Sequence, residues 1–168
     1  VKSPTSFYRI LISFLFLTGP MTAISQDNSF FEKTKIQHKI NEARHNFIQG
    51  NVKSALLNYK EAIALNSSNP KAEYGLAECY YKLQNYKKAK FHAEKAFQAD
   101  PKVDDNILFL LGRTYFRLNE LTKAKQKLSQ FKEITKSKSK LKDYGVDLKL
   151  AQIAYAETAK VNEKIVIE

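Results

Sequence analysis

The sequence is poor in residues that interrupt helices or cross-link a chain. Among 168 residues it has one Cys, four Pro, five Gly and no Trp. A single thiol excludes an intramolecular disulfide, so the fold must hold without the cross-links that many small secreted domains need. The scarcity of Pro and Gly leaves room for long helices. Nine Tyr and eleven Phe supply the aromatic volume that Trp does not.

Sequence signatures of catalysis and of cofactor binding are also missing. There is no Gly-rich phosphate-binding loop, no His-Glu-x-x-His and no Gly-x-Ser-x-Gly. His38 and His45 lie about 10 Å apart along one predicted helix, so we interpret them as surface residues rather than as one metal site. Cys79 is interpreted as a small buried hydrophobe, because the sequence indicates no base that would activate it. We therefore predict a protein that is not an enzyme and that needs no metal and no cofactor.

The chain carries a large excess of positive charge. Lys and Arg number 28 and Asp and Glu 17, which gives a formal net charge of +11. The excess is densest in residues 117–142, where nine basic residues accompany two acidic ones. Such a stretch is compatible with an acidic partner, an anionic membrane leaflet or nucleic acid. The alternative is an ordinary solvent-exposed helix face and linker.

Residues 1–25 have the three-part layout of a secretory signal peptide. Lys2 and Arg9 make a basic start, a mainly apolar run covers 10–17, and small residues precede a predicted cleavage after Ser25. A membrane anchor is the alternative, but the apolar run is much shorter than the roughly 20 residues of a spanning helix. We therefore expect an exported chain without a transmembrane helix in its mature form. Export also argues against nucleic acid as a partner.

The rest of the chain repeats itself. Tyr80–Leu83 matches Tyr115–Leu118 with an offset of 35 residues, and a weaker copy lies 34 residues upstream. A period of this size is typical of stacked helical pairs. Turns of two residues at 84–85 and 119–120 join the helices, so the two helices of a pair must be antiparallel neighbours.

We predict an all-α fold in which three helical pairs stack into a solenoid. The repeat domain covers 26–138, and its pairs occupy about 36–69, 70–103 and 105–138. Its first helix is expected to start at the capping residues of 27–29.

A terminal capping helix is predicted over 139–161, with a polar outer face that closes the stack. Residues 162–168 include three consecutive β-branched residues, which predict a strand or linker at the start of a following β domain. The apolar stripe of the capping helix is expected to consist of Tyr144, Leu148, Ala151 and Tyr155.

These residues resemble the tetratricopeptide repeat. In that family, a Leu-Gly pair and a Tyr lie on the first helix and small residues lie on the second. The third pair carries Leu111-Gly112, Tyr115 and Ala124, and the second pair has Ala77 at the glycine position. The first pair matches less well and is expected to cap the N-terminal end. The resemblance implies an α-solenoid that binds a protein or peptide partner on its concave face and performs no catalysis.

Carrying the family's concave positions over to this sequence predicts a partner-binding surface of aromatic and charged residues. Rings supply buried area and Arg supplies directional hydrogen bonds, which suits an extended or helical peptide. The alternative is that some of the rings pack between repeats or under the capping helix. The Lys/Asn set with which chaperone-type repeats clamp a C-terminal carboxylate is absent from these positions. The predicted surface consists of Arg44, Tyr74, Glu78, Tyr81, Lys82, Phe109, Arg113, Phe116 and Arg117, beside the apolar Ile40, Phe47 and Ile48.

The order of an exported helical module, a polar linker, a capping helix and a strand is similar to the N-terminal part of OmpA-family envelope proteins of Gram-negative bacteria. In those proteins a β-propeller and a peptidoglycan-binding domain follow, and some serve gliding motility or type IX secretion. This resemblance implies a periplasmic scaffold associated with the outer membrane. The alternative function is binding to an anionic membrane surface or an acidic partner through 117–142.

Overall fold

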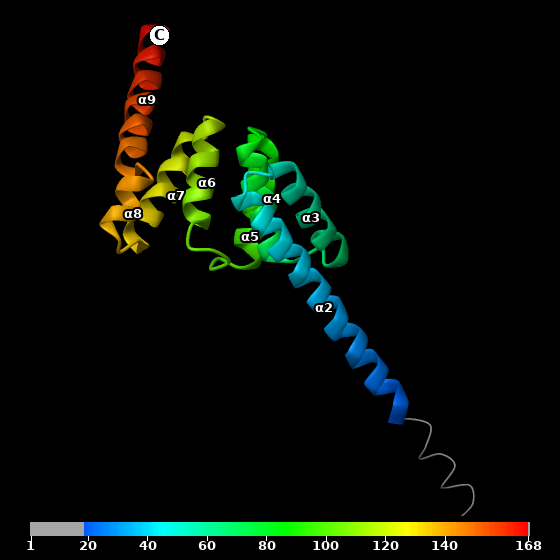
Figure 1. The fold of residues 1–168 in the computed structure, drawn as a ribbon. Helices are drawn as coiled ribbons and strands as arrows, with labels where there is room; N and C mark the ends of the chain where they lie inside the picture. Colours follow the sequence, from blue (N-terminus) through cyan, green and yellow to red (C-terminus); the bar gives the residue numbers. More distant parts are fainter. Residues whose placement is uncertain (1–18, 168) are drawn as a thin grey trace, which may run out of the picture.

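The described part of the chain is a stack of helices. The computed structural model describes residues 19–167, and side chains over 29–159. Every regular element in this part is an α-helix (Figure 1), so the predicted all-α fold is confirmed. In chain order the helices are α2 (Gly19–Ile48), α3 (Val52–Leu65), α4 (Pro70–Lys82), α5 (Tyr86–Ala99), α6 (Ile107–Arg117), α7 (Leu121–Ile134), α8 (Lys138–Asp143) and α9 (Val146–Ile167).

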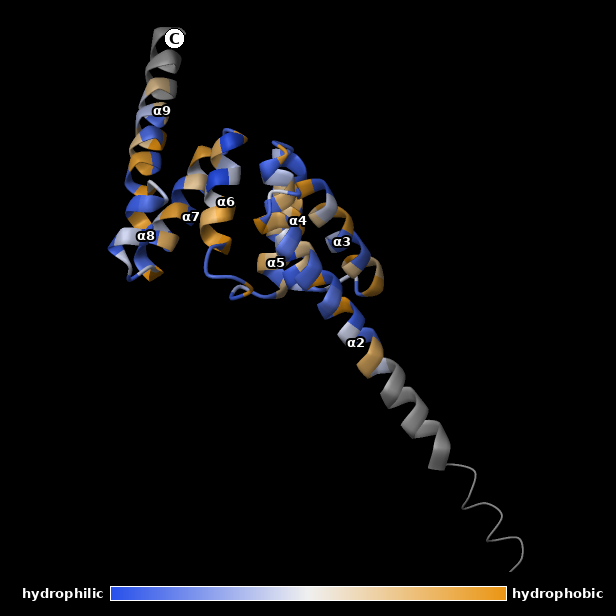
Figure 2. Cartoon of the chain, viewed as in Figure 1, coloured by the Kyte–Doolittle hydropathy of each residue, from blue (hydrophilic) through white to orange (hydrophobic). Residues whose placement is uncertain are grey.

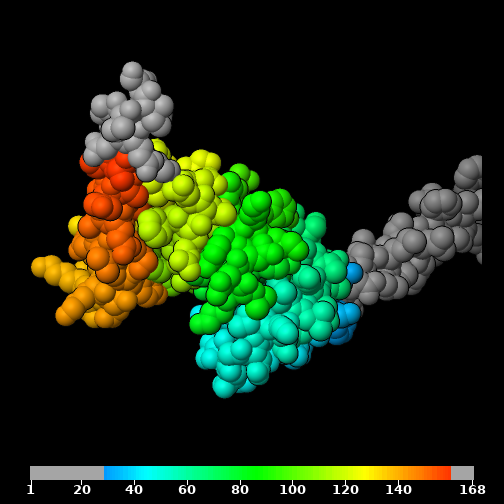
Figure 3. All heavy atoms as spheres, turned by 90° about the horizontal axis from the view of Figure 1, so that it is seen from above, coloured from blue at the N-terminus to red at the C-terminus, as the bar shows by residue number. Residues whose placement is uncertain are grey.

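The helices pair and stack in the order of the chain. Helix α2 packs on α3, α4 on α5 and α6 on α7, and successive pairs meet through α3–α4 and α5–α6. Figure 3 shows the pairs as successive slabs, with α8 and α9 at the end of the stack. The first helices also contact one another, α2 with α4 and α4 with α6, so they share one face of the solenoid. This shared face is where the candidate site lies.

Each pair is closed by a tight turn that contains one residue with positive φ. These residues are Gly50 (φ 81°), Gln84 (φ 59°) and Asn119 (φ 60°). In the first turn the Asn51 amide donates to Asn46 O at 2.8 Å, and the equivalent hydrogen bond recurs in the other two turns. This bond satisfies a carbonyl that the helix end leaves free. The short turns predicted for the second and third pairs are therefore present, although each has three residues (83–85 and 118–120) rather than two.

Two glycines mark the closest contacts between helices. At Gly112 a Cβ atom would lie 2.7 Å from Leu128 Cγ, which is the close approach of α6 and α7 that the repeat pattern predicts. Ala77, at the equivalent position of the second pair, is fully buried. At Gly75 a Cβ atom would overlap the ring of Tyr59, so this glycine lets α4 approach α3. The small residues thus set the spacing of the stack.

The first helix begins earlier than the sequence indicates. The predicted start at 27–29 is wrong, because α2 begins at Gly19 and extends beyond the stack (Figure 1). No Pro or Gly occurs from 21 to 49, and the small helix penalty of Asp, Asn and Ser does not interrupt a continuing helix. The predicted cleavage after Ser25 falls within α2, whereas residues 1–18 lie outside the described residues. The signal peptide therefore stays a prediction.

The single capping helix predicted over 139–161 is in fact two helices. Gly145, with a φ of 58°, separates α8 from α9. The break changes which face of α9 meets α7, so Val146 and Ile153 are the fully buried residues. The predicted stripe is therefore wrong, because its spacing assumes one uninterrupted helix. Of its members, Tyr144 is partly buried, whereas Leu148, Ala151 and Tyr155 are exposed.

The strand predicted within 162–168 is also wrong. Helix α9 continues to Ile167, through all three β-branched residues. A β-branched residue loses only a fraction of a kilocalorie per mole in a helix. A strand, in contrast, gains its stability from a neighbouring strand, and the described part of the chain offers none.

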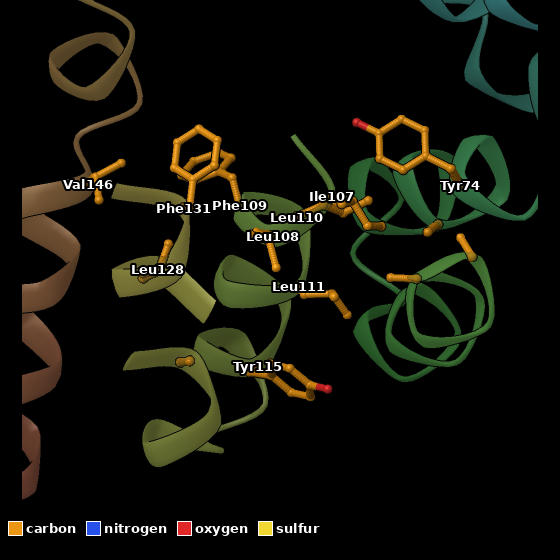
Figure 4. Close-up of a cluster of buried hydrophobic side chains, with 14 of the residues drawn as sticks. Tyr74, Ile107, Leu108, Phe109, Leu110, Leu111, Tyr115, Leu128, Phe131 and Val146 are labelled. Atoms are coloured by element: carbon orange, nitrogen blue, oxygen red, sulfur yellow. The ribbon is translucent and has the colours of Figure 1, made fainter. Parts of the chain in front are cut away.

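Two apolar clusters hold the stack together. The smaller one contains residues of α2, α3, α4 and α5, and the larger one contains residues of α4, α5, α6, α7 and α9. In the larger cluster Phe109 and Phe131 lie side by side, and Tyr74 faces them from α4 (Figure 4). Cys79 is fully buried, as predicted for a small hydrophobe, and burial raises the pKa of its thiol to about 12.

Candidate functional site

The shared face of the first helices is hollowed into a groove with two adjoining compartments. The α2 compartment has a volume of about 420 Å³ and lies between α2, α4 and the loop before α6. The α9 compartment, of about 350 Å³, lies between α4, α6 and the start of α9. Tyr74, Glu78 and Asn106 line both. One extended ligand segment could therefore contact both compartments.

The α2 compartment combines an apolar wall with charged groups. Ile40 and Arg44 from α2 and Tyr59 from α3 are among its lining residues. The loop between α5 and α6, largely hydrophilic in Figure 2, contributes Asp104 and Asn106. Arg44 is exposed and forms no ion pair with any described residue. Its guanidinium is therefore available to a ligand.

Glu78 lies at the junction of the two compartments. Tyr74 Oη donates a hydrogen bond to Glu78 Oε1 at 3.2 Å. Burial, and then the nearby Asp104 carboxylate, raise the pKa of Glu78 to about 7, against the opposing effects of Tyr74, Arg113 and Arg44. The groove thus holds a carboxyl group that titrates near neutral pH.

Arg113 lines the α9 compartment, and its guanidinium lies over the ring of Tyr81, which is not a lining residue. Its guanidinium carbon lies 4.0 Å from the centre of the Tyr81 ring and 5.4 Å from that of Phe109. Its Nε atom is buried without a hydrogen-bond partner. No described carboxylate lies within ion-pair distance of Arg113. The two neighbouring rings therefore orient a guanidinium whose hydrogen-bond donors are not all used within the protein.

The α9 compartment contains a second cation, Lys149. Its Nζ donates to the backbone O of Tyr144 at 2.7 Å and lies 5.5 Å from the centre of the Phe109 ring. Burial, and then the charge of Arg113, lower the pKa of Lys149. The side chain belongs to α9, so the terminal helix is part of the groove and not only a cap.

The predicted partner-binding residues divide into two groups. Five of them line the groove, and Tyr81 supports one of these, Arg113. Lys82, Phe116 and Arg117 line neither compartment; Arg117 Nε instead donates to Tyr86 Oη at 3.1 Å. The five lining residues are Arg44, Tyr74, Glu78, Phe109 and Arg113.

Two of the predicted rings are more buried than a binding surface requires. Tyr74 is 8% and Phe109 7% exposed. Phe109 packs against Tyr144 and Phe131, with ring centres 4.5 Å and 5.4 Å apart. The alternative of rings packed beneath the terminal segment therefore holds for Phe109, which contributes one edge of the compartment rather than a free face.

The sequence analysis missed several polar residues of the groove, among them Asp104, Asn106, Tyr144 and Lys149. Asn106 lies one helical turn before Phe109 on the same side of α6, so helical spacing could have indicated it. Asp104 lies in a loop and carries no such signal. Tyr144 and Lys149 could not be predicted as groove residues, because the break at Gly145 sets the direction of α9.

Other features of the described residues are simpler. No group of three His, Cys, Asp or Glu residues in the described part could hold a metal ion. His38 and His45 are exposed, as predicted. Among the described residues, no helix has the length and apolarity needed to cross a bilayer. In the basic stretch 117–142, part of the charge is paired, as in Lys125–Glu157 at 2.9 Å.

Two family profiles match the sequence. The one described as "Tetratricopeptide repeat" matches residues 47–94, and the one described as "Anaphase-promoting complex, cyclosome, subunit 3" matches residues 82–144. Together the two matches cover the stack from the end of α2 to the end of α8. A comparison with curated proteins gave no significant match.

Several solved structures share the fold. The first TPR of Spaghetti (RPAP3), bound to the HSP90 peptide SRMEEVD, is 18% identical with a TM-score of 0.64, covering 74% of this chain and 94% of that chain. YrrB, described as a TPR protein with an unusual peptide-binding site, is 24% identical with a TM-score of 0.62, covering 71% and 58%. The Yersinia enterocolitica type III secretion translocator chaperone SycD is 17% identical with a TM-score of 0.65, covering 75% and 88%.

Proposed function

Because this chain is a tetratricopeptide-repeat protein, we propose that it is a scaffold that binds a peptide segment of a protein partner in the groove between α2 and α9. The tetratricopeptide fold is a non-enzymatic protein-interaction scaffold. The observation that carries the proposal is the pair of adjoining compartments, which meet at Tyr74, Glu78 and Asn106. Arg44 and Arg113 supply donors that the protein leaves unpaired, beside aromatic walls that supply buried area. The similarity to structures with bound peptide gives further support.

The groove can be tested by selecting short random peptides on the whole chain and measuring their affinity by fluorescence anisotropy. The double variant Arg44→Ala/Tyr81→Ala removes one donor and the ring that supports Arg113, so we expect it to weaken binding at least about tenfold. The matched control is Lys53→Ala/Tyr155→Ala, which removes a cation and an exposed tyrosine that line neither compartment. Equal affinity of the groove variant and the control would rule out the groove as the site.

We propose that the scaffold acts in the envelope, as an exported protein of OmpA-like organisation that serves gliding or type IX secretion. The support is the signal-peptide layout of residues 1–25 in the sequence. N-terminal sequencing of the protein from the periplasm of a Gram-negative host should find Gln26 as the first residue, and Ala23→Arg should block processing. An uncleaved chain in the cytoplasm would contradict export.

A second candidate function is binding of an anionic surface by the basic stretch 117–142. Lys136, Lys138 and Lys142 favour it, because they are exposed and form no ion pair with described residues. The affinity of such binding would fall strongly as the salt concentration rises. Co-sedimentation with phosphatidylglycerol vesicles at low and high salt tests it, and absence of binding at low salt would exclude it.

A further inference from the structure

We propose that the α9 compartment is a subsite for the side-chain carboxylate of an Asp or Glu in the bound peptide, held between Arg113 and Lys149. The inference rests on the proposed function, since it specifies which kind of residue enters one compartment of the peptide groove. It also assigns a binding role to α9.

The first observation is the state of Arg113. Its guanidinium is held over Tyr81 and beside Phe109, so its orientation is fixed before a ligand arrives. Its Nε–H is buried without a partner, and a donor in that state costs free energy until it finds an acceptor. A carboxylate is the acceptor that the planar donor fork of Arg matches best.

The second observation is that Lys149 lines the same compartment. Two positive charges therefore share a space of about 350 Å³, and among the described residues neither forms an ion pair. Lys149 Nζ has a backbone carbonyl, Tyr144 O, as its hydrogen-bond acceptor. A ligand carboxylate between the two cations would relieve their mutual repulsion and accept hydrogen bonds from the guanidinium donors other than the buried Nε.

No acidic residue of the compartment forms an ion pair with Arg113 or Lys149 among the described residues, although Arg113 lies close enough to Glu78 to lower its pKa. Asp143 Oδ2 accepts a hydrogen bond from Ser139 Oγ at 3.2 Å and lies beyond ion-pair distance of both cations. Glu78 accepts from Tyr74, and it titrates near neutral pH with Asp104 as its acidic neighbour. Asp104 lines only the α2 compartment and Glu78 lines both, whereas Arg113 and Lys149 line only the α9 compartment, so a ligand carboxylate is favoured at the α9 end of the groove.

The test uses peptides selected on the whole chain and then synthesised with a C-terminal amide, which removes the terminal carboxylate as a source of charge. Each acidic residue of a peptide is replaced by its amide, Asp by Asn or Glu by Gln. The protein variant is Lys149→Met, which keeps an apolar stem over Phe109. The matched control is Lys142→Met, an exposed lysine of α8 outside the compartment.

We expect one acidic peptide position at which the amide replacement and Lys149→Met each weaken binding about tenfold. The two changes together should weaken it by less than the product of the two separate factors, because the amide replacement also removes the contact that Lys149→Met removes. Lys149→Arg should restore binding, and Lys142→Met should have no effect on it. Melting temperatures of the variants, followed by circular dichroism, confirm that each one is folded.

Three outcomes separate the two proposals. If no peptide is selected, or if Arg44→Ala/Tyr81→Ala does not weaken binding, the peptide groove itself is wrong. If peptides bind in the groove but show no coupling between an acidic residue and Lys149, only the carboxylate subsite is wrong. If the C-terminal amide alone abolishes binding, the site takes a chain terminus and the side-chain proposal is overturned.

Discussion

Helix α4 carries two glutamates in opposite situations. Glu73, 1% exposed, faces α5, where Lys95 Nζ contacts Oε1 and His92 Nδ1 lies 2.6 Å from Oε2. His92 is in turn stacked on Tyr80, with ring centres 5.2 Å apart. Glu78, five positions later, faces the groove and forms no ion pair among the described residues. The Glu73 carboxylate has a partner within the fold at each of its oxygens, whereas the Glu78 carboxylate accepts one hydrogen bond, from Tyr74.

The difference separates a structural charge from one that is available for binding. A buried carboxylate that contacts both Lys95 and His92 resists change, because removing it leaves these two side chains without their partner. A carboxyl group with a raised pKa lowers the stability of the fold when it ionises, and a protein retains such groups most often at functional sites. The contrast predicts opposite effects of substitution at two positions on one helix.

The largest effect is expected at Glu73. Glu73→Ala removes the acceptor of Lys95 and His92 and leaves a cavity, so the free energy of unfolding should fall by about 4 kcal/mol. Urea denaturation measures it. The control is Glu61→Ala, a carboxylate that makes an exposed ion pair with Lys39 at 2.9 Å and should cost less than about 1 kcal/mol. Similar losses at both positions would show that burial of Glu73 adds nothing.

Glu78→Gln should act in the opposite direction and raise the free energy of unfolding by about 3 kcal/mol at pH 8. The folded-state pKa of Glu78 is about 7, above the ordinary value of 4.5. Its stabilising contribution is therefore complete below pH 4.5 and is lost as the pH rises through 7. Gln does not ionise, so the variant should be more stable than the wild type at pH 8 and nearly equal to it at pH 4. Urea denaturation of both proteins at the two pH values measures the difference in the free energy of unfolding. A variant less stable than the wild type at pH 8 would contradict the raised pKa of Glu78.

The smallest effect is expected for Tyr74→Phe. The change removes the hydroxyl that donates to Glu78 Oε1, which should cost about 1 kcal/mol at pH 8. Because this hydrogen bond lowers the pKa of Glu78, its loss should raise that pKa further. Titration of the Glu78 carboxyl carbon by NMR measures the shift. A downward shift would show that Tyr74 does not hold the carboxylate.

The interior of the stack was largely predictable because it repeats. Gly112 and Ala77 occupy one repeat position and both lie at tight helix contacts, as the 35-residue offset implies. Five groove residues were found in the same way, since concave positions recur on each first helix. Lys82, Phe116 and Arg117 follow the same spacing but line neither compartment, because they lie at the ends of α4 and α6, whereas both compartments adjoin Asn106 at the start of α6.

The ends of the chain were predicted less well, because no repeat constrains them there. Residues 27–29 look like a helix start and 162–168 like a strand, yet both lie within long helices. Local propensities of a fraction of a kilocalorie per mole are easily overridden by the continuation of a helix. The exposed Leu148 and Tyr155 likewise show that a helix face cannot be read across an unrecognised break.

The amino-acid sequence by itself determined the all-α fold, the stacked helical pairs and the identity of the shared face, because each depends on spacing along the chain. Only the tertiary structure decided which charges find partners. Glu73 and Glu78 are glutamates of one helix, but one meets Lys95 and the other meets an open groove. Lys149 joins Arg113 only because Gly145 redirects α9. Pairing between side chains distant in sequence depends on the path of the backbone, which no local pattern specifies.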